Sequence, residues 1–179
     1  MKREHRYQKM LYEHYYGFAL KAVFRYIYSY DKAVYVVNDG FIKFFKKIEQ
    51  FKPGTEADTD KMLMAYLKRI MINTAIDELR QGKMTPEIGG ISDHVWDIPY
   101  NHENAEQMIL YKELIVLIKE LAPQYRAVFN LYVIDGYNHL EIAALLNIPV
   151  GTSKSHLSRA RALLQINIKK YEDAILCRI

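Results

Sequence analysis

Small hydroxyl side chains and basic side chains gather on one side of a helix that is predicted to start near residue 150. They are Thr152, Lys154, Ser155, His156, Ser158, Arg159 and Arg161. Hydroxyl groups can hydrogen-bond to phosphates or to base edges, and lysine and arginine attract the DNA backbone. Leu157, Ala160 and Leu164 recur at helical spacing on the other side, which is therefore expected to face the core of its domain. This pattern is typical of a helix that binds DNA.

Two short helices around a tight turn are predicted over residues 137–165, and they would position these side chains. Asn138 is a favourable N-cap, and Glu141 three residues later completes a capping-box pattern that begins the first helix. The first helix ends at Asn147-Ile148-Pro149, because proline cannot continue a helix and restricts the residue before it. The predicted arrangement is a helix-turn-helix, whose second helix enters the DNA major groove.

The charge of this region supports the same interpretation. Between Ile142 and Tyr171 there are five Lys/Arg residues and no Asp or Glu. The alternative is a solvated basic helix in a small helical bundle. Capping, turn and one-sided charge coincide here, and this coincidence favours DNA binding over the alternative.

A second polar face is predicted on a helix from about Lys61 to Gln81. Residues three or four apart place an aromatic ring, an amide and charged groups in one row, which consists of Tyr66, Arg69, Asn73, Asp77 and Arg80. Tyrosine can stack on an exposed base, asparagine can read a base edge, and arginine can hold phosphates. A solvated amphipathic face with Tyr66 partly in the core explains the row equally well, so the residues alone leave both interpretations open.

The chain is expected to be all-α, with two small helical domains joined by an acidic linker. Residues 84–107 contain five acids, no Lys or Arg, and several glycines and prolines. The predicted divisions are a first domain at 1–82, a linker at 83–105 and a helix-turn-helix domain at 106–179. Further helices are expected from Asp31 to about Phe51, from about Glu106 to Leu121 and from Pro123 to about Ile134, with a loop from Lys52 through Asp60.

Composition limits the classes of function. The formal charge of +4 and the isoelectric point near 9.0 favour an anionic partner. The N-terminus has no apolar signal-peptide core, and no apolar run reaches the roughly 20 residues of a membrane span, so a cytoplasmic protein is expected. The single cysteine, Cys177, cannot form an internal disulfide, and the six histidines show no metal-binding spacing. No enzyme motif or cofactor motif is apparent, so neither catalysis nor a cofactor or metal is expected.

Two stretches resemble a known family. MAYLKRIMINTAIDELRQGK, from Met64 to Lys83, is similar to regions 2.3 and 2.4 of bacterial sigma factors. LAPQYRAVFNLYVIDGYNHLEIAALLNIPVGTSKSHLSRARALLQ, from Leu121 to Gln165, is similar to region 4. Their order and the linker between them resemble the extracytoplasmic-function (ECF) group of the sigma-70 family. The resemblance implies a transcription initiation factor whose partners are promoter DNA, the β′ clamp and β flap of core RNA polymerase, and an anti-sigma factor.

The resemblance also implies roles for individual residues. It assigns Tyr66, Arg69, Asn73 and Arg80 to the promoter −10 element and the segment Phe51–Lys61 to capture of an extruded base. It assigns to the −35 element the residues Thr152, Lys154, Ser155, His156, Ser158, Arg159 and Arg161. It implies that polymerase is bound by Tyr35, Asn38, Asp39, Phe41, Ile42 and Phe45.

The chain departs from the family pattern at Tyr35, Asn38, Ser153 and His156, and it carries a glycine inside a predicted helix. The family typically has Asp and Gln where this chain has Tyr35 and Asn38. Gly40 lies inside the predicted polymerase-binding helix, at a cost of about 1 kcal/mol relative to alanine. Ser153 lies on the inward face of the recognition helix, where an apolar residue is common, so looser packing is expected there. His156 stands where arginine is frequent, and its protonation below about pH 6.5 would restore some attraction to phosphate.

Two alternative functions are also considered. The first is a stand-alone helix-turn-helix transcriptional regulator with an N-terminal sensory or dimerisation half, which would bind an operator without polymerase. The second is a protein-interaction adaptor whose basic helix contacts an acidic partner, and which would show no salt-dependent affinity for DNA.

Overall fold

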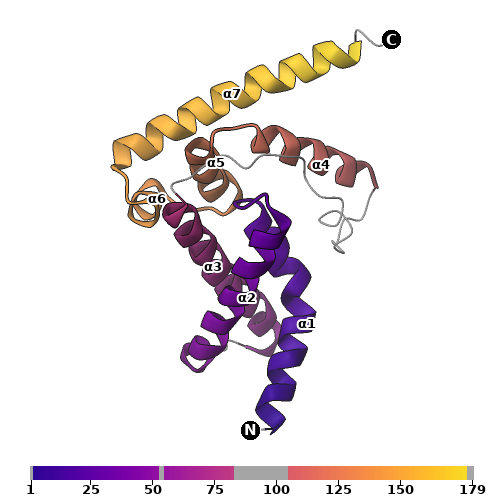
Figure 1. The fold of residues 1–179 in the computed structure, drawn as a ribbon, viewed down its shortest axis with the longest axis vertical. Coiled ribbons are helices and arrows are strands. Elements are labelled where there is room, and N and C mark those ends of the chain that lie inside the picture. Colours follow the sequence, from indigo (N-terminus) through magenta and orange to yellow (C-terminus); the bar gives the residue numbers. More distant parts are fainter. Residues whose placement is uncertain (1, 53–54, 83–104, 177–179) are drawn as a thin grey trace. The chain divides into compact units, whose positions relative to one another are not determined.

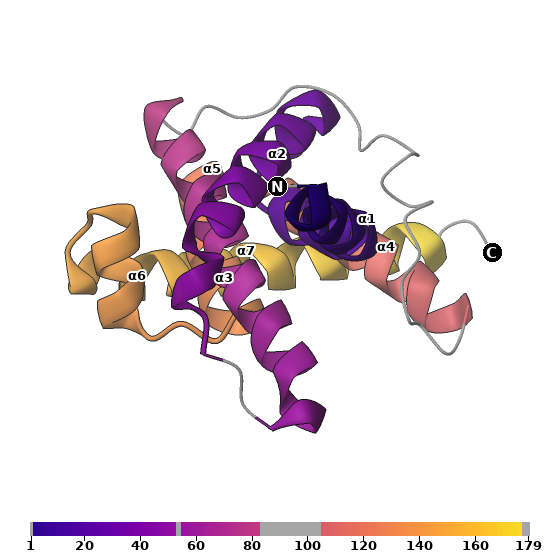
Figure 2. The ribbon, with the colours of Figure 1, turned by 90° about the horizontal axis from the view of Figure 1, so that it is seen from below.

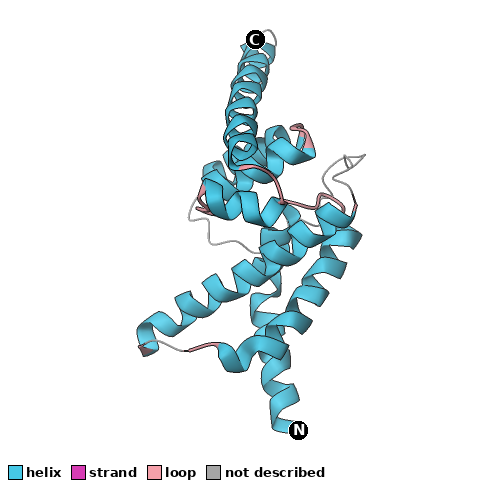
Figure 3. Cartoon of the chain, turned by 90° about the vertical axis from the view of Figure 1, so that its left-hand side faces the viewer, coloured by secondary structure: helices cyan, strands magenta, loops and turns pink. Residues whose placement is uncertain are grey.

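The computed structural model describes residues 2–52, 55–82 and 105–176 of the chain. Every regular element within these ranges is helical (Figure 3), which confirms the predicted all-α class. The helices fall into two compact units, each of which is described by itself. The predicted linker lies outside the described residues except for Ala105, and the two boundaries between the predicted divisions remain a prediction.

The first unit contains three long helices that pack on one another (Figure 1). They are α1 (Lys2–Phe24), α2 (Tyr30–Lys47) and α3 (Glu56–Gln81), with a short 3₁₀ helix, η1 (Ile48–Gln50), after α2. In Figure 2 α1 is seen nearly end-on, with α2 and α3 beside it. Fully buried apolar side chains from all three helices form the core, among them Leu20, Val37, Phe44, Leu67 and Ile72.

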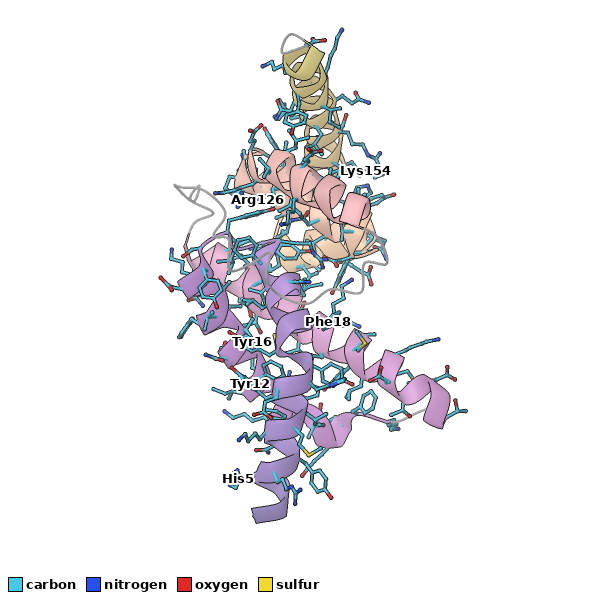
Figure 4. All side chains as sticks on the ribbon, turned by 90° about the vertical axis from the view of Figure 1, so that its right-hand side faces the viewer. His5, Tyr12, Tyr16, Phe18, Arg126 and Lys154 are labelled. Atoms are coloured by element: carbon cyan, nitrogen blue, oxygen red, sulfur yellow. The ribbon has the colours of Figure 1, made fainter. Side chains whose placement is uncertain are left out.

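Aromatic rings fill the contact between α1 and α2. Tyr12 and Tyr16 lie one turn apart on α1 (Figure 4), with ring centroids 5.2 Å apart. The Tyr12 ring lies 4.7 Å from that of Phe41 on α2, and its hydroxyl donates to Asn38 Oδ1 at 2.9 Å. Tyr15 on the neighbouring face of α1 donates its hydroxyl to Asp60 on α3. The abundance of tyrosine therefore serves the packing of this unit.

Gly40 allows α2 to approach α3 closely. A Cβ atom at this position would overlap the Sδ atom of Met71 and lie 3.0 Å from its Cε. Both residues are buried, and the Met71 side chain is fully enclosed. The helix-propensity cost that the sequence predicts at Gly40 is therefore offset by close packing of the two helices.

The second unit contains α4 (Ala105–Lys119), α5 (Pro123–Phe129), a π-helical segment η3 (Asn130–Ile134), α6 (His139–Leu146) and the long α7 (Val150–Leu176). Its core includes Ile118, Leu121, Ala160 and Leu164. Arg126 on α5 (Figure 4) is only 3% exposed, and its Nη1 donates to the Lys119 carbonyl at 3.1 Å. This bond satisfies a carbonyl in the last turn of α4, where helix carbonyls lack a partner within the helix.

Two helix boundaries differ from the sequence prediction. α3 begins at Glu56, so the predicted start near Lys61 and the predicted loop through Asp60 were wrong. The Thr55 carbonyl accepts the amides of Asp58 and Thr59 at 3.0 Å, and the Thr55 hydroxyl donates to Asp58 Oδ2 at 2.7 Å. The polar residues that suggested a loop thus form the first turn of the helix. α2 ends at Lys47 and continues only as η1, short of the predicted end at Phe51.

Candidate nucleic-acid interface

α6 and α7 form the predicted helix-turn-helix, and its capping is confirmed. Asn138 Oδ1 accepts the amides of Leu140 at 2.9 Å and Glu141 at 3.0 Å, while Glu141 Oε2 accepts the Asn138 amide at 2.8 Å. α6 ends at Asn147, which adopts the left-handed conformation with φ 54° and ψ 50°. Asparagine tolerates this conformation better than most residues, so the tight turn before α7 is built into the sequence.

The recognition helix α7 buries one face and exposes the other, as predicted. Leu157, Ala160 and Leu164 are buried in the core of the unit. The opposite face carries the hydroxyl and basic side chains: Lys154, Ser155, Ser158, Arg159 and Arg161 are exposed, and Thr152 and His156 are half-buried. In its present rotamer the Ser155 hydroxyl donates to the Thr152 carbonyl at 3.0 Å, so Ser155 offers a DNA ligand an acceptor.

Ser153 on the inward face of α7 has a partner that sequence reasoning did not find. Its side chain is fully buried, and its Oγ shares a 2.9 Å hydrogen bond with Nδ1 of His139, the first residue of α6. A buried hydroxyl is costly only when it lacks a hydrogen bond. The hydroxyl therefore links the two helices of the motif, in addition to filling a position where an apolar side chain is common.

His156 lies on the flank of α7 against Tyr125 of α5. The two rings meet edge to face with centroids 5.1 Å apart. Burial lowers the pKa of His156 below its usual value, and the nearby positive charge of Arg159 lowers it further. The neutral ring is therefore favoured at pH 6.5, and the protonation expected below this pH requires more acidic solution.

The predicted −10 face on α3 is only partly open. Arg69, Asp77 and Arg80 are exposed, and Arg80 Nη1 lies 3.8 Å from Asp77 Oδ1 in a surface ion pair of little stabilising effect. Asn73 is half-buried, and its Oδ1 is enclosed without a hydrogen-bond partner. A ligand can reach this amide oxygen only if the Asn73 side chain turns outward, and the oxygen would then gain the hydrogen bond that it lacks here.

Tyr66 shows the packing that the alternative interpretation expected. Its ring lies 5.6 Å from that of Phe51 and 6.1 Å from that of Phe44, and its hydroxyl donates to the Lys47 carbonyl at 3.2 Å. The side chain is half-buried, so part of it still reaches the surface. Tyr66 thus joins α3 to the end of α2, and its stacking on a base stays a prediction.

The comparisons with known proteins match both candidate faces. Residues 11–85 match the model of sigma-70 region 2, and residues 111–164 match that of sigma-70 region 4. The chain is 30% identical over 151 residues to the ECF RNA polymerase sigma-E factor of Escherichia coli strain K12, covering 75% of this chain and 72% of the relative. The chain belongs to the ECF group of the sigma-70 family. It is thus a sigma factor, a protein that directs transcription initiation.

Two further comparisons agree with this assignment. The chain is 27% identical over 143 residues to the ECF RNA polymerase sigma factor SigE of Mycolicibacterium smegmatis, covering 77% of this chain but 52% of that relative. The chain therefore spans about half the length of this larger relative. The sigma factor RpoE in complex with the anti-sigma factor NepR from Bartonella quintana has a similar fold, with a TM-score of 0.54, 21% identity and coverage of 90% of this chain and 96% of that one.

Five of the six predicted polymerase-binding residues on α2 of the sigma factor are exposed or half-buried. Tyr35 is 67% exposed and Ile42 is 54% exposed, while Asn38 accepts the bond from Tyr12 and Asp39 pairs with Lys43 at 2.9 Å. Apolar side chains this open on a helix are suited to a protein partner.

The placement of Phe41 corrects one prediction. Its side chain is only 2% exposed, so it cannot contact polymerase directly in this conformation. Its ring is stacked on that of Phe45, with centroids 5.9 Å apart, and Phe45 is half-buried. Phe41 therefore supports the exposed face of α2 from the core side.

The described parts of the sigma factor offer no group of three or more His, Cys, Asp and Glu residues that could hold a metal ion. Within the same residues, no helix is both long enough and apolar enough to cross a membrane.

Proposed function

We propose that the sigma factor binds core RNA polymerase through the exposed face of α2 and recognises promoters through two separate DNA contacts. In this proposal α3 reads the −10 element with Arg69, Asn73, Arg80 and the open edge of Tyr66. α7 reads the −35 element with the exposed residues of its recognition face. The proposal assigns all phosphoryl-transfer chemistry to the polymerase and places the protein in the cytoplasm, where polymerase works.

The observation that carries the proposal is the presence of both matched regions on one chain, each with a polar helical face. The α7 face combines hydroxyl groups with arginine and lysine, which suits duplex DNA. The α3 face combines exposed arginines with the half-buried amide side chain of Asn73, which suits the base edges of an opened strand. A stand-alone helix-turn-helix regulator is not favoured, because the half it would use for sensing matches sigma region 2.

In vitro transcription tests the proposal. Purified full-length chain is added to core RNA polymerase with a fragment library of its own genome, and transcript starts are mapped by sequencing. Discrete starts that require the chain support the proposal. If the same starts occur with core polymerase alone, or if no start depends on the chain across the library, the proposal is rejected.

We also propose that an anti-sigma factor regulates this chain. The support is the fold similarity to RpoE of Bartonella quintana, which was solved in complex with the anti-sigma factor NepR. Such a partner would compete with core polymerase for the face around Tyr35 and Ile42. Proteins that copurify with the tagged chain from its own host would be added to the transcription assay. A partner that lowers chain-dependent transcription supports the idea, and displacement by excess core polymerase tests the shared face.

A further inference from the structure

Arg159 on the recognition helix is held by a tyrosine from another helix. Its Nη1 donates to the hydroxyl of Tyr125 on α5 at 3.2 Å. The Tyr125 ring packs against the core cluster of the unit. It also contacts the ring of His156, which lies one turn before Arg159 on α7. The Tyr125 ring is thus fixed by packing, and its hydroxyl is directed at the guanidinium group of an exposed side chain.

Arg161 is held in a second way. Its Cζ lies 5.8 Å from the centroid of the Tyr132 ring, which comes from the π-helical segment η3. His139 also stacks on that ring, with centroids 4.6 Å apart and an interplanar angle of 27°. His139 is in turn fixed by its hydrogen bond to the buried Ser153. A chain of contacts therefore runs from the interior of the motif to the guanidinium group of Arg161.

These contacts have a consequence for DNA binding. A free arginine side chain loses roughly 2 kcal/mol of rotamer freedom when it is fixed. Guanidinium has five N–H donors, so a single bond to Tyr125 leaves Arg159 several donors for a phosphate or a base edge. A contact with a ring face, as at Tyr132, uses none of the in-plane donors of Arg161. An arginine that is already ordered loses less freedom on binding.

We infer that Tyr125 and Tyr132 are positioning residues that pre-order Arg159 and Arg161 for contact with the −35 duplex. This inference rests on the proposed function, because it needs α7 to bind that element. Neither tyrosine belongs to the recognition face itself. Each acts through one arginine, so its effect on DNA affinity must disappear when that arginine is removed.

Double-mutant cycles test this dependence. Binding of the sigma factor–polymerase complex to a promoter found in the transcription assay is measured for Tyr125→Phe, Arg159→Ala and the double variant. Tyr125→Phe keeps the ring and removes the hydroxyl, and affinity should fall about threefold or more because Arg159 must then be ordered on binding. In the Arg159→Ala background the same change should have no effect. An equal effect in both backgrounds, or no effect in either, would overturn the inference for Tyr125.

The second cycle uses the ring of Tyr132. Tyr132→Leu should lower affinity about twofold or more through loss of the cation–π contact, and Tyr132→Phe should restore it because a ring is kept. Both changes should be silent in the Arg161→Ala background. Failure of Tyr132→Phe to restore binding, or a loss of affinity that persists without Arg161, would overturn the inference for Tyr132.

Tyr171→Phe is the matched control. It removes a tyrosine hydroxyl that donates to Glu113 at 3.1 Å within the same unit, away from both arginines. Promoter affinity of this variant should equal that of the wild type; a loss as large as that of Tyr125→Phe would show that any lost hydroxyl weakens binding and would overturn the inference.

A promoter with a scrambled −35 element distinguishes failure of the proposed function of α7 from failure of the positioning inference. If scrambling does not weaken wild-type binding, the proposed function of α7 fails. If scrambling weakens it and the cycles are additive, only the positioning inference fails.

Discussion

The position of His156 shows how local surroundings decide what one side chain contributes. It stands where arginine is frequent in the family, and a protonated histidine would replace part of that charge. Burial against Tyr125 and the charge of Arg159 both favour the neutral ring, and both lower its pKa. The neutral ring still packs against Tyr125, which also holds Arg159. The histidine therefore serves packing at neutral pH and supplies no cation.

The lowered pKa gives the protein a pH-dependent stability. The unfolded chain binds a proton on this residue more readily than the folded chain does, so protonation favours unfolding. The free energy of unfolding should be highest above pH 6.5 and should decline as the pH falls through 6.5 toward the lowered pKa. In the His156→Gln variant the free energy of unfolding should decline less as the pH falls, because the titrating imidazole is gone. Urea unfolding of both proteins at pH 7.5 and pH 5.5 measures it, and an identical pH dependence would contradict the assignment.

The N-terminus of α6 depends on one short side chain. Asn138 caps two amides, and Glu141 returns a bond to the Asn138 amide. Asn138→Ala should lower the free energy of unfolding of this unit by about 1 kcal/mol, whereas Asn138→Ser should cost much less because serine also caps. Chemical denaturation followed by a probe in the second unit measures the effect. Equal losses for alanine and serine would show that capping is not the cause.

The crossing of α2 and α3 depends on the absence of a side chain at Gly40. Gly40→Ala gains up to about 1 kcal/mol of helix propensity, but its Cβ overlaps buried Met71, and overpacking costs about 1–3 kcal/mol. We expect Gly40→Ala to destabilise the wild type and to stabilise the Met71→Ala variant, whose cavity accepts the new methyl group. Unfolding free energies of the four proteins test this change of sign. If Gly40→Ala destabilised the protein in both backgrounds, the Met71 side chain would not be the cause of the clash.

The elements differ in how well the sequence alone predicts them. The helix-turn-helix was predicted well because its boundaries depend on local chemistry: an N-cap at Asn138, a left-handed residue at Asn147 and a proline at 149. The start of α3 was missed because the polar residues after Thr55 fit a loop and a first helical turn equally well. The π-helical form of residues 130–134 was also missed, since its Asp135 amide to Asn130 carbonyl bond has no residue signature of its own.

Contacts between helices could not be predicted from spacing. Ser153 was identified as a polar residue on an inward face, but its partner His139 comes from another helix, fourteen residues earlier. Phe41 was grouped with exposed polymerase-binding residues because a family pattern gives positions and not burial. The contacts of Tyr125 and Tyr132 with the arginines likewise depend on tertiary packing. The exposed and buried faces of the helices could therefore be predicted, whereas the contacts between helices could not.

At the scale of the whole molecule, the two predicted DNA faces belong to different compact units. α3 carries Asn73 in the first unit, and α7 carries Arg159 in the second. Effects of residues that share no partners and no contacts are usually additive. Substitutions at these two positions should therefore impair separate steps of initiation, and the effect of one should not depend on the other.

This separation yields a test with opposite outcomes. Asn73→Ala removes an amide that would read an unpaired base, so promoter opening, measured by permanganate footprinting, should fall about fivefold or more. Binding of a −35 duplex should be unchanged. Arg159→Ala should weaken −35 duplex binding and reduce the slope of log affinity against log salt by about 0.9, as expected for one lost phosphate contact. Once saturating protein restores occupancy of the promoter, its opening should be normal.

Matched controls come from parts of the chain outside the two sigma-region matches. Gln8→Ala removes an amide from α1, and Lys170→Ala removes an exposed cation from the distal part of α7. Neither control should change opening or −35 binding. The division of labour between the units would be refuted if Asn73→Ala and Arg159→Ala lowered opening and duplex binding in equal proportion. It would also be refuted if their effects on opening, at saturating protein, depended on each other. Independent effects on the two steps would establish that α7 positions the polymerase upstream while α3 opens the promoter.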